Sequence, residues 1–146
     1  MTNVPTFMMN IPSSYDTAVR NNVWMEEYDD EDIIVNKPKA IREMWEVYSF
    51  LASQGFVYLL PTPIDCKLQD LVFVANNGIV LQHTPIYIGS NFKATNRIGE
   101  EVIGMRFFDS LGYKTIRSPF EFEGEAELKY HRVKESHSNP LLAYTV

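Results

Sequence analysis

The hydrophobic positions of this chain predict a helix that is followed directly by a strand. From Lys39 to Ser53, apolar residues recur at steps of three and four, which places them along one face of a helix. Gly55 follows, and glycine suits the left-handed conformation in which helices commonly end. The sequence FVYLL at 56–60 then predicts a buried strand, which the prolines after it would stop.

The same order of elements is predicted a second time. A helical stripe from about Ile98 to Leu111 is closed by Gly112, and a short strand at Tyr113–Ile116 follows. The heptapeptide FLASQGF, which starts at Phe50, matches FFDSLGY, which starts 57 positions later. A recurring helix, glycine, strand and proline is typical of repeat architectures, although this order is also common in α/β proteins at large. We expect the two helices to be related by a rotation and each to pack outside a small mixed sheet.

These patterns predict one domain, residues 1–146, with repeat units at roughly 31–88 and 89–146. The hydrophobic fraction of 45% is ordinary for a globular protein, and a chain of this length can bury roughly two-thirds of its unfolded surface. The acidic run at 26–32 lacks the spaced ligands of a calcium loop, and we expect a solvated connector before a strand at 33–35. We expect no metal and no cofactor.

The charge and the termini exclude several classes of partner. The formal net charge of -6 disfavours nucleic acid, since phosphates require clustered lysine and arginine, but it is compatible with a cationic ligand. No apolar run approaches the ~20 residues of a membrane span, and the N-terminus lacks the basic start and apolar core of a signal peptide. A single cysteine excludes an internal disulfide. We therefore expect a cytoplasmic protein with neither a nucleic-acid nor a membrane partner.

The stretch QDLVFVANNGIVL at 69–81 predicts a buried strand from Leu71 to Ala75, a turn and a second strand. Asp70 stands directly before the first strand, and the 57-residue offset pairs it with Glu127. In a fold with rotational pseudo-symmetry, equivalent positions converge on the central axis. Two carboxylates there would repel unless a cation lay between them, and a guanidinium offers a planar fork of N–H donors that matches carboxylates. The alternative is that both acids are solvated loop residues, the commonest situation for aspartate and glutamate.

Several motifs resemble those of the pentein superfamily. QDLVFVANNG resembles its segment P-D-x-V-F-x-A-N-x-G, and FEGEAEL at 122–128 resembles its F-E-G-x-G-D. Between them, ATNRIGEEVIGMRFFDSLGY resembles R-x-x-E followed by an amphipathic helix and L-G-Y, and NNVWM at 21–25 resembles N-x-x-M. The motifs occur in the order and at the spacing of the family. The closest resemblance is to the branch of dimethylarginine dimethylaminohydrolases and amidinotransferases.

This resemblance implies an α+β fold, namely a partial pentein α/β-propeller with about two to two and a half ββαβ-type units of a five-unit fan. It implies chemistry on a guanidine, in which a cysteine attacks the central carbon and the amidino group then passes to water or an amine. The implied partner is a cationic, arginine-like guanidino small molecule. The chain covers only about half of the family's length, and the expected catalytic histidine and cysteine lie beyond where it stops.

The resemblance also implies roles for five residues. Asp70 matches an acid that binds substrate, and Asn76 stands where other branches carry a second acid. Arg97 matches a basic residue that is often assigned to the substrate's carboxylate. Glu123 matches the catalytic glutamate that grips the guanidinium and helps to manage its protons. Glu127 replaces the aspartate of that motif and keeps its charge.

A nucleophile and a base can also be sought within the chain itself. Cys66 and His83 are the candidate pair, but a lone cysteine beside a strand is usually a packing residue. His131 and His137 lie in a polar segment, where we expect solvated side chains.

The leading hypothesis is the N-terminal half of a guanidine-modifying enzyme, which supplies substrate-binding carboxylates and is inactive alone. The alternatives are a non-catalytic binding or assembly protein derived from a pentein, and a nonfunctional remnant. Half of a closed fan would leave open strand edges and apolar faces. We therefore expect self-association or binding of a complementary C-terminal half, with Phe107, Phe108 or the tail at 141–146 near the contact. The tail is expected to be a strand whose partner is missing.

Overall fold

The computed structural model describes residues 4–20, 23–63, 65–81, 84–131 and 142–145. The chain folds into two compact units, the first being Met1–Val74 with Ala94–Arg97 and the second Ala75–Lys93 with Ile98–Val146. Helices and mixed sheets occur together, so the expected α+β class is confirmed, but no sheet closes on itself within the described residues. The number of propeller units stays a prediction. In this described part, no helix is both long and apolar enough to cross a membrane.

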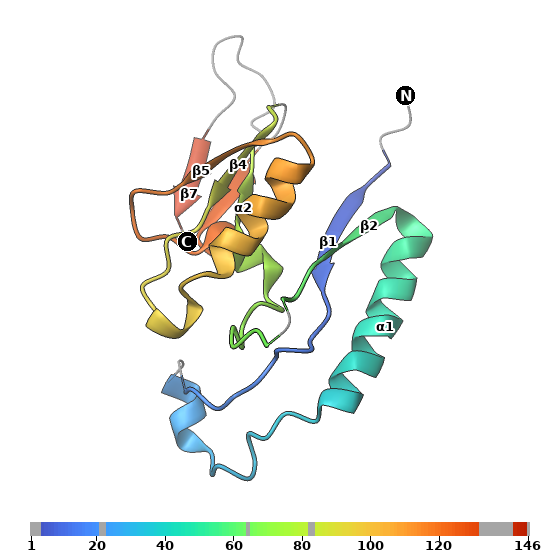
Figure 1. The fold of residues 1–146 in the computed structure, drawn as a ribbon, viewed down its shortest axis with the longest axis vertical. Coiled ribbons are helices and arrows are strands. Elements are labelled where there is room, and N and C mark those ends of the chain that lie inside the picture. The colour runs from blue at the N-terminus through green and yellow to red at the C-terminus, as the bar shows by residue number, and fades with distance from the viewer. Residues whose placement is uncertain (1–3, 21–22, 64, 82–83, 132–141, 146) are drawn as a thin grey trace. The chain divides into compact units, whose positions relative to one another are not determined.

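The first unit is built from a pair of parallel strands and a long helix. Strand β1 (Thr6–Asn10) pairs with β2 (Phe56–Leu60), and helix α1 (Lys37–Gln54) lies between them in sequence and packs against β2 (Figure 1). Parallel neighbours need such a crossover connection. β2 has the predicted bounds, but it is not the buried strand expected, because Phe56 is 66% exposed and only Leu60 of this strand is buried. β1 has no counterpart in the sequence prediction. The mixed sheet expected beside this helix is wrong, because the described sheet there has two parallel strands.

Local contacts fix both ends of α1. The Asn36 side chain accepts a hydrogen bond of 3.0 Å from the backbone N–H of Lys39, which satisfies one donor of the first turn. At the other end, Gly55 is extended, with φ of -177°, and not left-handed as expected. Glycine is required there by a close approach, since a Cβ atom would lie 2.1 Å from the carbonyl oxygen of Pro5.

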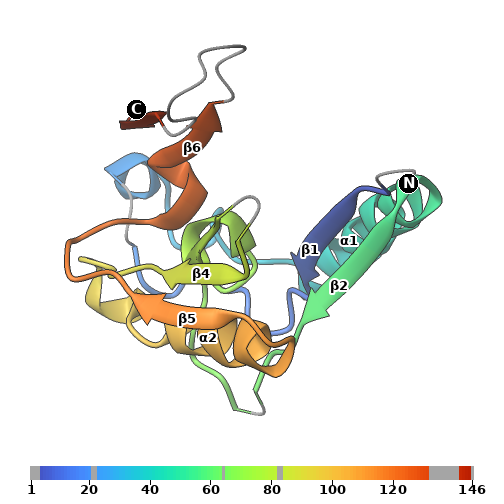
Figure 2. The same cartoon turned by 90° about the horizontal axis from the view of Figure 1, so that it is seen from above.

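The second unit contains a mixed three-stranded sheet with a helix packed against it. β3 (Gly78–Val80) runs antiparallel to β4 (Ile86–Gly89), and β4 runs parallel to β5 (Lys114–Arg117). Helix α2 (Glu100–Ser110) packs against β4 and β5 (Figure 2). The mixed sheet expected beside the second helix is therefore confirmed. Gly112, with φ of +84°, reverses the chain after the helix in the left-handed conformation that glycine adopts at little cost.

Tyr87 lies at the centre of the second unit's core. It is 1% exposed, and its ring stacks on Phe108 with centroids 4.2 Å apart. Gly78 and Gly104 make room for it, because a Cβ atom at either position would lie 2.5 Å from the Tyr87 hydroxyl oxygen. Burial, together with the negative charge of Glu101, raises the pKa of this phenol well above its ordinary value. Phe108 is therefore buried within its own unit, and the expected contact through Phe107, Phe108 or the tail stays a prediction.

Two of the predicted strands are not formed. Leu71–Ala75 forms turns that lead into the 3-10 helix η2 (Val74–Asn77), and residues 33–35 are a turn followed by irregular chain. In the first case the backbone closes locally, as the N–H of Phe73 donates to the Asp70 carbonyl at 2.9 Å. The first residue of this apolar run is fully buried, but the third is 48% exposed. The run therefore marks a partly buried turn and not a core strand.

The tail does form a strand, but its partner is present. β7 (Leu142–Thr145) pairs antiparallel with β6 (Leu128–His131). The expectation of a missing partner for this strand is therefore wrong.

The 57-residue offset relates the two helices and the strands that follow them, but it does not relate the elements after those strands. β6 follows the 3-10 helix η4 (Gly124–Ala126) as β3 follows η2, yet β3 and β6 begin 50 positions apart. The loop between β5 and η4 is shorter than the loop between β2 and η2, which changes the register. The residue before β6 is Glu127 and the residue before β3 is Asn77. The predicted equivalence of Asp70 and Glu127 is therefore wrong.

Candidate functional site

Asp70 and Arg97 lie together in the first unit. The Arg97 Nε atom is 4.0 Å from the Asp70 Oδ2 atom, and the two side chains are 8% exposed for Arg97 and 9% for Asp70. Arg97 ends the 3-10 helix η3 (Thr95–Arg97), which belongs to this unit. Burying a charge is costly unless an opposite charge is close, so each residue makes the burial of the other tolerable. The charge of the Asp70 carboxylate is thus compensated by the protein's own guanidinium.

Gln69, directly before Asp70, anchors an irregular segment of the first unit. Its side-chain amide donates to the Val19 carbonyl at 2.7 Å and accepts from the Val19 N–H at 3.1 Å. Gln69 is buried, and both bonds are partly buried. The chain around residue 19 is therefore fixed to the residue that precedes the Asp70 carboxylate.

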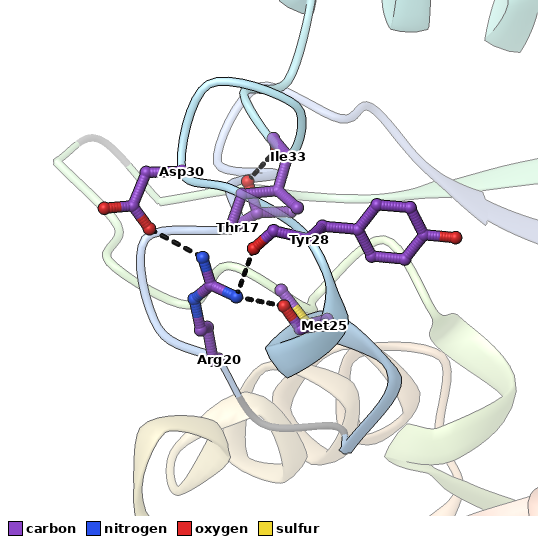
Figure 3. A network of polar contacts seen from close by, with 6 residues as sticks. All are labelled: Thr17, Arg20, Met25, Tyr28, Asp30 and Ile33. Atoms are coloured by element: carbon purple, nitrogen blue, oxygen red, sulfur yellow. Dashed lines mark hydrogen bonds and ion pairs between the residues drawn. The ribbon is translucent and has the colours of Figure 1, made fainter.

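The guanidinium of Arg20 holds the turn that follows this anchor (Figure 3). It donates to the carbonyls of Met25 and Tyr28, the latter at 2.8 Å, and to the Asp30 carboxylate at 2.6 Å. Met25 belongs to the 3-10 helix η1 (Val23–Glu27), and the last carbonyls of a short helix need partners outside it. The asparagines of the N-x-x-M resemblance, residues 21 and 22, lie outside the described residues.

Asn76, Glu123 and Glu127 come together in the second unit. The Nδ2 group of Asn76 donates to the Glu123 carboxylate at 3.4 Å. The Oε2 atom of Glu127 accepts from the backbone N–H of Glu123 at 3.0 Å, so this carboxylate closes the turn that carries Glu123. Gly124 needs its glycine, with φ of +59°, whereas Ala126 has no positive φ. Alanine is therefore accommodated where the resemblance has a second glycine.

Ser90 and Asn91 tie these turns to the end of β4, and sequence reasoning missed both of them. The Ser90 hydroxyl donates to the Asn76 carbonyl at 2.5 Å, and its backbone N–H donates to the Asn77 carbonyl at 3.0 Å. Asn91 and Phe122 exchange backbone hydrogen bonds of 3.0 and 3.1 Å. Small polar residues after a strand are typical of any turn, so the sequence carried no signal that could have marked them.

Cys66 is placed in the first unit. It lines a hollow of about 350 Å³ together with Ser13, Ser14, Thr62, Pro63 and Asp65. His83, His137 and the side chain of His131 lie outside the described residues, so the Cys66–His83 pair stays a prediction. Among the residues that the structure describes, no three histidine, cysteine, aspartate or glutamate side chains are grouped to hold a metal ion.

The mixed α+β fold matches domains of pentein-type enzymes that modify guanidino groups. The crystal structure of unliganded AgrE matches 87% of this chain with 29% identity and a TM-score of 0.76, and the match covers 18% of the AgrE chain. A cysteine-to-alanine mutant of AgrE, crystallised in a binary complex with L-arginine, matches with the same identity, coverage and TM-score.

The N-terminal domain of ArgZ, an arginine dihydrolase of the ornithine–ammonia cycle in cyanobacteria, is also similar. A mutant of this domain bound to substrate matches 86% of this chain and 44% of its own, with 25% identity and a TM-score of 0.74. This chain thus spans less than half the length of either relative. Neither a scan against protein-family models nor a search of curated proteins finds a match. The likenesses show that this chain shares its fold with parts of these enzymes, and the dimethylarginine and amidinotransferase branch stays a prediction.

Proposed function

We propose that this chain supplies part of the ligand-binding site of an enzyme that modifies the guanidino group of L-arginine or a close derivative. The observation that carries the proposal is the Asn76–Glu123 pair, in which an amide and a carboxylate meet at 3.4 Å although they are 47 positions apart. Support comes from the likeness to AgrE, which was crystallised with L-arginine.

The Asn76–Glu123 pair suits a guanidinium because carboxylate oxygens accept its N–H groups in parallel. The Glu123 carboxylate would accept two of them, and it can receive and return a guanidinium proton as a general acid–base. The Oδ1 atom of Asn76 is an acceptor that a further ligand N–H can use while Nδ2 donates to Glu123. One carboxylate and one neutral amide then set a single negative charge against the single positive charge of the ligand.

We also retain ligand-binding roles for Asp70 and Arg97 in the first unit. Because these two charges already compensate each other, a ligand that joins them must offer a positive group to Asp70 and a negative group to Arg97. Glu127 acts differently in this proposal, since it supports the backbone of Glu123 and so contributes to binding through that residue.

We propose that the nucleophilic cysteine and its histidine base come from a complementary segment or chain, so that this chain alone does not turn over arginine. Splitting a guanidine needs both groups, because the nucleophile must be activated by a base within hydrogen-bond reach. The second candidate, a binding protein without catalysis, differs in one outcome only. It would bind the same ligand but would gain no turnover when any complementary half is added.

The test is calorimetric titration of the chain with L-arginine. Glu123→Gln keeps the shape of the side chain and removes its charge, and we expect binding to weaken roughly 10- to 100-fold, because a hydrogen bond to a charged group contributes about 1.5–3 kcal/mol. Glu121→Gln is the matched control, since Glu121 is exposed and lies two positions earlier. No binding by the unmodified chain, or equal binding by the Glu123→Gln variant, would contradict the proposal.

A further inference from the structure

We propose that Ser90 is a positioning residue for the Asn76–Glu123 pair and that it acts with its neighbour Asn91. The inference rests on the proposed function, and it concerns how the two ligand-binding groups are held together. Neither residue is placed in contact with the ligand.

Ser90 fixes the turn that carries Asn76. It is 0% exposed, and its hydroxyl and backbone N–H donate to two successive carbonyls, those of Asn76 and Asn77, at 2.5 and 3.0 Å. These carbonyls lie at the end of η2, and the last carbonyls of a 3-10 helix have no hydrogen-bond donor within the helix. The peptide planes on both sides of Asn77 are thereby held, and with them the direction in which the Asn76 side chain leaves the backbone.

Asn91 fixes the turn that carries Glu123. Its two backbone hydrogen bonds to Phe122 form an isolated antiparallel bridge directly before Glu123. The next residue, Gly124, then packs so closely that a Cβ atom would lie 2.3 Å from the Ala75 carbonyl oxygen. Two consecutive residues at the end of β4 therefore hold one member each of the amide–carboxylate pair.

The hydroxyl of Ser90 is the part of this arrangement that a side-chain substitution can remove. Alanine would leave the partly buried Asn76 carbonyl without that donor, and η2 could turn relative to η4. The Asn76 Nδ2 to Glu123 distance is already 3.4 Å, close to the limit of a hydrogen bond, so a small rotation would break it. Misplacement of binding groups by about 1 Å can cost on the order of 100-fold in function, and we expect Ser90→Ala to weaken guanidinium binding about tenfold.

The experiment compares Ser90→Ala with Ser110→Ala. In Ser110 the hydroxyl also donates to a backbone carbonyl, that of Phe107 at 2.6 Å, but it is exposed and unconnected to Asn76. Both variants are titrated with L-arginine and with methylguanidinium, and the Asn76 side-chain amide is followed by NMR in the absence of ligand. Ser90→Cys, which keeps the volume and a weaker donor, serves as a second variant if the alanine variant does not fold.

We expect Ser90→Ala to shift the Asn76 amide resonances and to weaken the binding of both ligands about tenfold. The affinity of Ser90→Cys should lie between those of Ser90→Ala and the unmodified chain. Ser110→Ala should change neither the resonances nor the affinities. Unchanged affinity and unshifted Asn76 resonances in Ser90→Ala would overturn the inference. Failure of the unmodified chain to bind either ligand would instead refute the proposed function. In that case the positioning role of Ser90 is tested by the Asn76 resonances alone. If they do not shift in Ser90→Ala, the positioning role is refuted.

Discussion

Replacing Gly124 by alanine should destabilise the second unit much more than replacing Gly112 by alanine. Both glycines have positive φ, +59° at Gly124 and +84° at Gly112, so each alanine pays the cost of the left-handed conformation. That cost is about 1–2 kcal/mol per residue. The two sites differ in their surroundings, because nothing lies within 4 Å of a Cβ atom at Gly112.

At Gly124 the added methyl group would meet backbone atoms that cannot rotate away. It would lie 2.3 Å from the Ala75 carbonyl oxygen and 2.8 Å from the Gly78 nitrogen. These atoms belong to η2 and the start of β3, which the Ser90 hydrogen bonds hold in place. Overpacking of this kind costs about 1–3 kcal/mol. We therefore expect a loss of about 2–5 kcal/mol for Gly124→Ala, against about 1–2 kcal/mol for Gly112→Ala.

The difference is measured by urea denaturation, with far-ultraviolet circular dichroism as the unfolding signal. With a urea m value of about 1–3 kcal/mol/M, the midpoints of the two variants should differ by roughly 1 M. Gly112→Ala serves as the internal control for the conformational cost, so the difference isolates the steric part. Equal midpoints for the two variants would refute the close packing of η4 on η2, and with it the basis for a fixed Asn76–Glu123 pair.

Four further outcomes can be measured on the same chain. Tyr87→Phe should leave stability unchanged or raise it by up to about 2 kcal/mol, because the lost hydroxyl is buried without a described hydrogen-bond partner. Because the pKa of Tyr87 is raised in the folded state, this phenol ionises first in the unfolded state as the pH rises above 10.0, its ordinary pKa. The free energy of unfolding should therefore fall above this pH in the unmodified chain and fall less in Tyr87→Phe. Urea midpoints measured across this pH range test the difference. Asp70→Asn should cost about 1–3 kcal/mol by removing the negative charge 4.0 Å from the buried Arg97 guanidinium, and adding Arg97→Gln should cost less than the sum of the single changes in a double-mutant cycle. Asn36→Ala should cost about 1 kcal/mol through the lost helix cap, whereas Asn36→Asp should not, and equal urea midpoints for the two would contradict the cap.

The sequence by itself determined the elements whose signal is local. Apolar steps of three and four gave α1 and α2, and the short apolar runs after each glycine gave β2 and β5, because both patterns depend only on a few neighbouring residues. The same reasoning failed at Leu71–Ala75, where an apolar run forms turns. The physical reason is that a run of apolar residues fixes burial but not backbone conformation, and here local hydrogen bonds closed the chain.

Only the tertiary structure decided which polar residues meet. Asn76 and Glu123 are 47 positions apart, and their contact depends on Ser90 and Asn91, which carry no local signal. The chain offset suggested that Asp70 and Glu127 were equivalent, but a shorter loop after β5 shifted that register, and the Asp70 carboxylate was compensated by Arg97 instead. Contacts between residues far apart in the sequence depend on loop lengths and on the need to compensate each buried charge. Neither can be read from the periodicity of a single segment.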